Sequence, residues 1–307
     1  MTMNTDKAYF VDKFSPFKKK IIWQINNSCN FRCEYCFGLE LFEPAKKHPY
    51  SNEHITNSFN KTDMSWLIVI TGGEPFLHNN FIDLLKLLTK NHTVAFSSNF
   101  SHNDIYRLTE IENKDNILLV NASAHFEYRE KMTRNLDDFI EKVLFLQNNN
   151  IPVLVSHVAY PPYISSIEDH FQNLRNRGIK DLSVLTFRSV YNDCNYPENY
   201  TKQEIEFIDR NSVDYTESLI ARKQTDFYGH YCEAGQNFFF MDFHGNVRRC
   251  GSVHKKYGNL FEQTFFPPKN DKLMPCIVHD CVDCYLGFLS VKDDKAGKIR
   301  VFIEKYK

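Results

Sequence analysis

The sequence lacks several features that would assign it to a membrane, to secretion or to nucleic acid. No run of about 18 apolar residues occurs, which excludes a membrane-spanning helix. Residues 1–20 are polar and lack the apolar stretch of a secretory signal. The 37 basic and 38 acidic residues give a net charge of -1, which offers no general attraction for nucleic acid or an acidic membrane. We therefore expect a globular, cytoplasmic protein with no nucleic-acid and no membrane partner.

What the chain does have is nine cysteines, and they are grouped. Cys29, Cys33 and Cys36 lie near the start, Cys194 stands alone, and five more lie between residues 232 and 284. Disulfides are rare in a reducing cytoplasm, whereas grouped thiols there favour metal binding. Metal binding is therefore the first function that we predict for these cysteines.

Up to about residue 225, short apolar strands alternate with amphipathic helices. Strands are expected at residues 21–25, 65–70, 93–97, 116–122, 153–157 and 182–187. Helices are expected at residues 81–88, 136–146, 167–177 and, as one longer helix, 204–222. This alternation predicts an α/β fold with a parallel sheet and outer helices. About six βα units form a partial (β/α)6 TIM-like barrel, short of a closed one.

Beyond residue 225 the composition changes to cysteine, glycine and aromatic residues. Residues 238–242 and 247–249, separated by a turn containing Gly245, are predicted to form a β-hairpin. We therefore divide the chain into a lead-in (1–20), a barrel core (21–225) and a small cysteine-rich domain (226–307).

The first cysteine group has the spacing C-x3-C-x2-C and directly follows the first predicted strand. A [4Fe–4S] cluster is usually held by four cysteines, so three thiolates leave one iron with an open position. Its place at the carboxyl end of a strand is where active sites of βα folds lie. The alternatives are a structural zinc site, which needs a fourth ligand, and three unconnected core cysteines.

This loop, with Tyr35 just before its last cysteine, resembles the signature of the radical S-adenosylmethionine (SAM) superfamily. Gly72-Gly73-Glu74-Pro75 follows the second strand, where that family has its Gly-Gly-Glu-Pro motif. The glycines permit close approach of a ligand, and Glu74 is a natural acceptor for the SAM ammonium. The resemblance implies that SAM binds the open iron and is cleaved to methionine and a 5′-deoxyadenosyl radical.

The resemblance also implies further contacts with SAM at the ends of later strands. The implied cofactor-binding residues are Tyr35, Gly72, Gly73, Glu74, Pro75, Ser98, Asn99, Ser123 and Arg134. His157 and Arg188 end the fifth and sixth strands and are candidate substrate residues, although His157 could equally be an interior histidine.

The second cysteine group is similar to the SPASM/twitch extension of one radical SAM subgroup. A cysteine precedes the hairpin, Gly245-x4-Cys250 follows it, and a C-x2-C pair comes later. A hairpin brings its two ends together, so its flanking thiols become neighbours. The resemblance implies one auxiliary [4Fe–4S] cluster, with a zinc ribbon as the alternative. The implied ligands are Cys232, Cys250, Cys281 and Cys284.

Cys276 remains outside this set, and three roles stay open for it. It replaces one of the four ligands, it acts on substrate, or it packs in an apolar contact.

An auxiliary cluster favours a net oxidation, either dehydrogenation or crosslinking, of a small polar metabolite or a peptide side chain. The electron donor would be a flavodoxin or ferredoxin. With only some 20 residues before the first predicted strand, we expect no N-terminal peptide-recognition domain.

Two other outcomes stay open. One is a redox-neutral epimerase or rearrangement enzyme in which Cys194 or Cys276 donates a hydrogen atom. The other is a non-catalytic iron–sulfur electron carrier.

Overall fold

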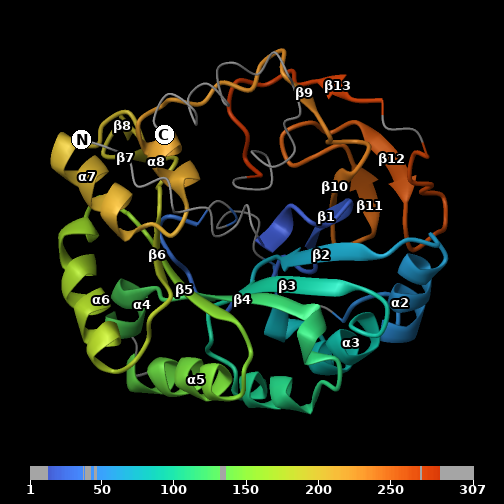
Figure 1. Cartoon of the computed structure of the whole chain (residues 1–307), viewed down its shortest axis with the longest axis horizontal. Coiled ribbons are helices and arrows are strands. Elements are labelled where there is room, and N and C mark those ends of the chain that lie inside the picture. The colour runs from blue at the N-terminus through green and yellow to red at the C-terminus, as the bar shows by residue number, and fades with distance from the viewer. Residues whose placement is uncertain are drawn as a thin grey trace.

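The structure, a computed structural model, describes residues 13–36, 38, 43–44, 47–131, 136–269 and 272–283. Its main feature is a curved nine-stranded sheet in the order β12-β11-β10-β1-β2-β3-β4-β5-β6 (Figure 1). The barrel strands are β1 (Lys19–Gln24), β2 (Trp66–Thr71), β3 (Thr93–Ser98), β4 (Ile117–Ser123), β5 (Val153–Val158) and β6 (Leu182–Leu185). All neighbours from β1 to β6 are parallel, which confirms the predicted partial barrel.

Helices cover the outer side of this sheet (Figure 1). They are α2 (Asn52–Asn60), α3 (Phe81–Leu88), α4 (Phe126–Lys131), α5 (Leu136–Asn148) and α6 (Ile167–Asn176). Short 3-10 helices are η2 (Pro75–Leu77), η3 (Asn103–Glu110), η4 (Lys114–Asn116) and η5 (Ile164–Ser166). None of the helices in the described part of the chain is long and apolar enough to cross a membrane.

The strands are apolar on both faces because both faces are buried, as is typical of parallel sheets. Ile21 and Trp23 on β1 belong to the main core. The alternate residue Ile22 belongs to a second, smaller core on the opposite face. That second core also contains Cys232 and Cys250, so the C-terminal cysteine segment packs against the sheet itself.

The prediction of one long helix over residues 204–222 is wrong. The structure has α7 (Lys202–Asn211) and α8 (Tyr215–Ala221), with Asp214 accepting a hydrogen bond from the Thr216 amide as the cap of α8. The intervening residues dock on β6 instead: Ser212 Oγ donates to the Val184 carbonyl at 2.7 Å. Sequence periodicity does not reveal such a break because the partner strand lies far away in the chain.

The C-terminal hairpin is confirmed as β10 (Phe238–Met241) and β11 (Asn246–Arg248), which pair antiparallel and are followed by β12 (Lys256–Asn259). β10 also pairs in parallel with β1, with Lys20 opposite Phe238. The barrel sheet therefore continues into the C-terminal segment, and a domain boundary near residue 225 stays a prediction. The remaining short strands are β7 (Val190–Tyr191), β8 (Cys194–Asn195), β9 (Tyr231–Cys232) and β13 (Met274–Pro275).

Tyr200 fixes the carboxyl end of the barrel from within the core. Its hydroxyl donates to the Ala159 carbonyl at 2.5 Å and accepts from the Phe187 amide at 3.0 Å. Phenylalanine at position 200 lacks this hydroxyl and leaves the buried Ala159 carbonyl and Phe187 amide without these hydrogen bonds. We expect Tyr200→Phe to lower the free energy of unfolding by about 1–3 kcal/mol, measured by denaturant titration.

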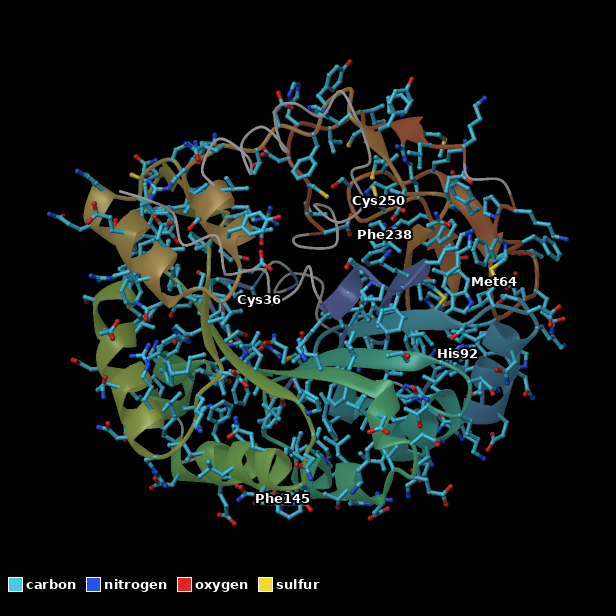
Figure 2. All side chains as sticks on the ribbon, in the orientation of Figure 1. Cys36, Met64, His92, Phe145, Phe238 and Cys250 are labelled. Carbon is cyan, nitrogen blue, oxygen red and sulfur yellow. The ribbon has the colours of Figure 1, made fainter. Side chains whose placement is uncertain are left out.

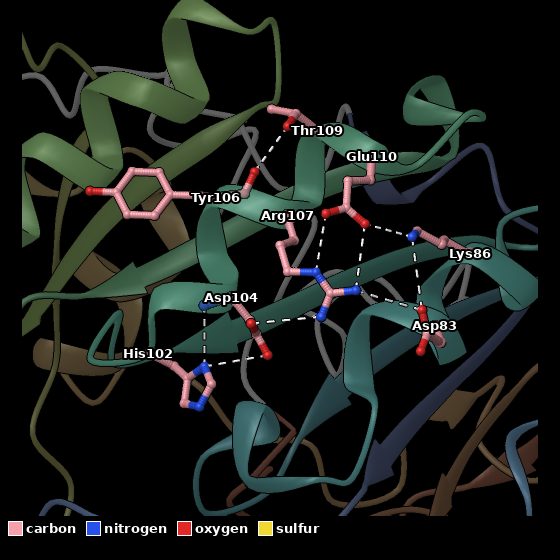
Figure 3. A network of polar contacts seen from close by, with 8 residues as sticks. All are labelled: Asp83, Lys86, His102, Asp104, Tyr106, Arg107, Thr109 and Glu110. Carbon is pink, nitrogen blue, oxygen red and sulfur yellow. Dashed lines mark hydrogen bonds and ion pairs between the residues drawn. The ribbon is translucent and has the colours of Figure 1, made fainter.

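The control for Tyr200→Phe is a substitution of Arg107, which belongs to a polar network on the protein surface (Figure 3). There the Arg107 guanidinium lies near Asp83, Asp104 and Glu110. These groups are exposed and screened by solvent. Arg107→Ala is therefore expected to leave the denaturation midpoint unchanged. A Tyr200→Phe protein as stable as Arg107→Ala would contradict the role given to the tyrosine hydroxyl.

Candidate functional site

A cavity of about 400 Å³ lies at the carboxyl ends of the barrel strands. This volume is within the range of small-molecule sites. The three thiols of the first cysteine group line it together. Figure 2 labels Cys36 near the middle of this open end of the molecule. The other predicted residues that line the cavity are Tyr35, Gly72, Gly73, Glu74, Ser98, Asn99, Ser123 and Arg188.

The two sequence motifs are held together by backbone hydrogen bonds. The Gly73 amide donates to the Asn26 carbonyl at 3.1 Å, and the Glu74 amide donates to the Ser28 carbonyl at 2.7 Å. Gly72 has φ +148, a conformation that favours glycine. A Cβ atom on Gly73 would lie 2.0 Å from the Ser28 carbonyl oxygen. The glycines therefore allow the motif to lie directly against the backbone of the cysteine loop.

The three thiols of the loop are poor free anions but suitable cluster ligands. Burial raises the pKa of Cys29 to about 11 and raises the pKa values of Cys33 and Cys36 as well. Binding iron displaces the proton of each thiol. In the described part of the chain no three side chains converge on a single metal ion. A cluster does not require this, since each thiolate binds a different iron.

Glu74 is fully buried and already has protein partners for both carboxylate oxygens. Oε1 accepts from the Phe76 amide at 3.1 Å and from Ser98 Oγ at 2.8 Å. Oε2 accepts from the Asn99 amide at 2.7 Å. Burial raises the pKa of the carboxyl to about 7. The residue thus joins the ends of β2 and β3, and its contact with the SAM ammonium stays a prediction.

Glutamine at position 74 tests this joining role. A glutamine side chain accepts hydrogen bonds only at its oxygen, whereas both carboxylate oxygens of Glu74 accept them. At least one of the three donors would therefore face the glutamine NH2 group. We expect Glu74→Gln to lower the free energy of unfolding by about 1–3 kcal/mol. The measurement is denaturant titration. Glu112→Gln on an exposed loop is the control and should be neutral. An equally neutral Glu74→Gln would show that the carboxylate does not join the strands.

His125 connects β4 with the cysteine loop. Its Nδ1 atom lies 2.7 Å from the Tyr35 hydroxyl and 3.3 Å from Cys33 Sγ. The residue has φ 46, a left-handed conformation that is uncommon outside glycine and clusters at functional sites. Burial lowers the pKa of the ring to about 3, so it is neutral. Tyr35 therefore lines the cavity with its hydroxyl directed to this histidine.

The sequence prediction missed Arg129, which is buried beside the site. Its Nε donates to the Ala124 carbonyl at 2.5 Å, and Nη2 donates to the carbonyls of Asn99 and, at 3.5 Å, Ser123. It thereby joins the ends of β3 and β4. The predicted Arg134 lies outside the described residues. The signal in the sequence was a basic residue soon after the fourth strand. Both Arg129 and Arg134 fit this signal, so it did not identify Arg129.

Three other predicted residues do not line the cavity. Pro75 begins η2 and is buried. His157 is buried, with Nε2 3.4 Å from Glu127 Oε2. Cys194 is exposed on β8. The roles predicted for these three residues stay predictions.

Glu217 and Thr186 line the cavity without having been predicted. Glu217 is fully buried and accepts a hydrogen bond from the Thr186 amide at 2.6 Å. Burial raises the pKa of this carboxyl. The sequence does not identify Glu217 as a cavity residue, because its surroundings have the pattern of an ordinary helix.

The second cysteine group forms a separate small cavity, and Figure 2 labels Cys250 there. Arg188 connects the two sites, because it lines the first cavity and its Nη1 donates to the Cys281 carbonyl at 2.9 Å. Cys284 lies outside the described residues. The thiols that line the second cavity are Cys232, Cys250, Cys276 and Cys281.

The chain is similar to known proteins over part of its length. Residues 20–142 match a family described as a 4Fe-4S single cluster domain. A protein of Methanocaldococcus jannaschii, assigned as a glycyl-radical enzyme activating enzyme, is 40% identical over 63 residues, which is 20% of this chain and 23% of that one. The GTP 3′,8-cyclase of Haemophilus ducreyi is 28% identical over 96 residues, 29% of this chain and 28% of that one. The matches thus span about a quarter of these relatives.

Two solved structures share the fold over most of the chain. Streptococcus suis SuiB bound to S-adenosylmethionine has a TM-score of 0.59 at 16% identity, covering 80% of this chain and 64% of that one. The enzyme anSMEcpe with bound AdoMet and a Cp18Cys peptide has a TM-score of 0.56 at 16% identity, covering 80% and 78%. At this identity the likeness shows the fold.

Proposed function

We propose that this chain is a radical SAM enzyme that reductively cleaves SAM and removes a hydrogen atom from a substrate. One observation carries the proposal: the three thiols of the first cysteine group and the Gly72–Glu74 motif line the same cavity. Cys29, Cys33 and Cys36 would hold the [4Fe–4S] cluster. The bound cluster would supply the electron for the cleavage of SAM to methionine and a 5′-deoxyadenosyl radical.

The chain's own residues would position SAM and protect the radical. Gly72 and Gly73 would lie beside SAM next to the thiols, and the Ser98, Asn99 and Ser123 side chains would supply polar groups at the adjacent strand ends. Phe31, Val158 and Leu185 form an apolar part of the same wall. An apolar wall that excludes water limits side reactions of a reactive intermediate.

We further propose a net oxidation, either dehydrogenation or crosslinking, of a peptide side chain or a small polar metabolite. The hydrogen atom leaves with 5′-deoxyadenosine, and the substrate then gives up one more electron and a proton, a two-electron loss in total. An auxiliary cluster on the second cysteine group would accept that electron. The peptide bound in the anSMEcpe structure supports a peptide substrate. The donor for SAM cleavage would be a flavodoxin or ferredoxin.

A redox-neutral epimerisation needs a thiol that returns a hydrogen atom to substrate. Both candidates lie away from the cavity: Cys194 is exposed on β8, and Cys276 lines the second cavity. This placement favours oxidation. Turnover in deuterium oxide separates the two outcomes once a substrate is found. Solvent deuterium at the reacting carbon would contradict the oxidation.

Metal analysis tests the proposed cofactor content. After anaerobic reconstitution we expect about eight irons and about eight sulfides per chain, the content of two [4Fe–4S] clusters. About four irons together with one zinc would leave the SAM cluster in place and contradict the auxiliary cluster.

A further inference from the structure

Backbone amides supply hydrogen bonds to two thiols of the first cysteine group. The Phe31 amide donates to Cys29 Sγ at 3.4 Å, and a backbone hydrogen bond from Gly38 stabilises the thiolate form of Cys36. Hydrogen bonds to the sulfurs are among the factors that set the reduction potential of a [4Fe–4S] cluster. The donor at the third thiol therefore bears on how readily a cluster on these cysteines would take up an electron.

Cys33, the third thiol, lies beside a side-chain nitrogen. This residue is only 7% exposed, and its Sγ atom lies 3.3 Å from His125 Nδ1. The same nitrogen lies 2.7 Å from the Tyr35 hydroxyl. Two arrangements of the protons fit these distances: Nδ1 carries a proton and donates it, or the tyrosine hydroxyl donates to an unprotonated Nδ1.

The charge on the sulfur distinguishes these two arrangements. Iron binds cysteine as the thiolate, which accepts hydrogen bonds and has no proton to donate. An unprotonated Nδ1 would direct its lone pair toward this anion across 3.3 Å, which is unfavourable. With the proton on Nδ1, the same contact is a charge-assisted hydrogen bond. Iron on Cys33 therefore favours the tautomer of His125 that carries its proton on Nδ1.

The position of the His125 ring is fixed by the backbone and by two aromatic neighbours. The His125 carbonyl accepts hydrogen bonds from the Tyr128 and Arg129 amides at 3.1 and 3.0 Å, in the first turn of α4. The ring lies edge-on to Phe31, with 5.6 Å between ring centroids, and is stacked on Tyr35 at 5.9 Å. Both aromatic residues belong to the cysteine loop, so the histidine is held against that loop from two sides.

We infer that His125 donates a hydrogen bond from Nδ1 to the Cys33 thiolate and thereby raises the reduction potential of the SAM-binding cluster. The inference rests on the proposed function, which places that cluster on the first cysteine group. A reduced cluster carries one more negative charge than an oxidised one, so a donor to sulfur stabilises the reduced form more. His125 acts through Cys33 and is a positioning residue.

Asparagine and leucine at position 125 provide a matched pair of substitutions. Asparagine Nδ2 is as many bonds from Cα as histidine Nδ1, and asparagine tolerates the left-handed φ of 46 at this position. Leucine has the same branched shape and no donor. The measurement is a potentiometric titration of the full-length, reconstituted protein, followed by electron paramagnetic resonance (EPR). The part of the signal that changes when SAM is added reports the first cluster.

We expect His125→Leu to lower the ratio of reduced to oxidised first cluster about tenfold at the wild-type midpoint, which corresponds to about 59 mV for one electron. His125→Asn retains a donor and should keep the wild-type ratio. The inference is overturned if His125→Leu binds full iron and keeps the wild-type ratio. It is also overturned if the ratio falls as far in His125→Asn as in His125→Leu.

A measurement on the unsubstituted protein decides the case in which leucine is not tolerated at position 125. Histidine labelled with the heavy nitrogen isotope is incorporated, and the reduced protein is studied by pulsed EPR. A hydrogen bond from Nδ1 to Cys33 Sγ transmits spin density, so we expect a hyperfine coupling to histidine nitrogen that His125→Asn abolishes. No such coupling, or one that persists in His125→Asn, would overturn the inference.

Failure of the proposed function has a different signature. A reconstituted protein that shows no SAM-sensitive EPR signal has no SAM-binding cluster, which overturns the proposed function and the role of His125 with it. A protein that has this signal and cleaves SAM, but shows neither the shift in potential nor the nitrogen coupling, overturns the role of His125 alone.

Discussion

Alanine at position 33 is expected to reduce 5′-deoxyadenosine release by about 10³-fold or more, at least about 4 kcal/mol in the barrier. Cys33 is buried in the cavity with Cys29 and Cys36, and with one thiol removed the remaining two hold the cluster poorly. Without the cluster no iron is available to bind SAM or to deliver the electron. The measurement is chromatographic quantification of 5′-deoxyadenosine after reaction with dithionite and SAM.

Iron content provides the second readout for Cys33→Ala. We expect it to fall from about eight to about four per chain, because the auxiliary cluster does not use this thiol. Cys194→Ala is the matched control, since that thiol is exposed on β8 and lines neither cavity. If Cys33→Ala cleaves SAM at the same rate as Cys194→Ala, Cys33 is not a ligand of the cluster.

Gly73→Ala is expected to have the second-largest effect, through the backbone. The added Cβ atom would lie 2.0 Å from the Ser28 carbonyl oxygen and 2.9 Å from the Cys29 amide nitrogen. Both contacts are with backbone, so the methyl group can fit only if the cysteine loop moves. We expect a loss of about 3 kcal/mol in the free energy of unfolding together with poor retention of the SAM cluster.

The control for this substitution is Gly178→Ala, which follows α6. There the Cβ atom would meet only Leu144 Cδ2, at 3.8 Å, and the remaining cost of about 1 kcal/mol arises from the left-handed φ of +96. Denaturant titration and iron analysis of both variants separate a steric clash at the loop from a general glycine effect. A Gly73→Ala protein with full iron content would show that the close approach is not required.

The barrel was predictable because its determinants are local. Each strand is a short apolar run, and the C-x3-C-x2-C spacing and the Gly-Gly-Glu-Pro motif lie at strand ends, where parallel strands bring them to one edge. The helix α2 was missed because Asn52–Asn60 is mostly polar. The break between α7 and α8 was missed because Ser212 binds β6, which is a tertiary contact.

The second site was predictable only in part, for a similar reason. The hairpin places Cys250 near Cys232, as the sequence indicated. The place of Cys276 depends on the pairing of β9 with β13, two-residue strands with no hydrophobic pattern of their own. Likewise the parallel pairing of β10 with β1 joins distant segments and has no local signal.

The most direct test of the account is SAM cleavage by the wild-type protein. The anaerobically reconstituted chain is mixed with SAM and dithionite, and 5′-deoxyadenosine and methionine are quantified over time. We predict that the two products appear in equal amounts and require both the protein and the reductant. A protein that carries its full iron content yet releases no 5′-deoxyadenosine with any reductant would contradict the proposed function.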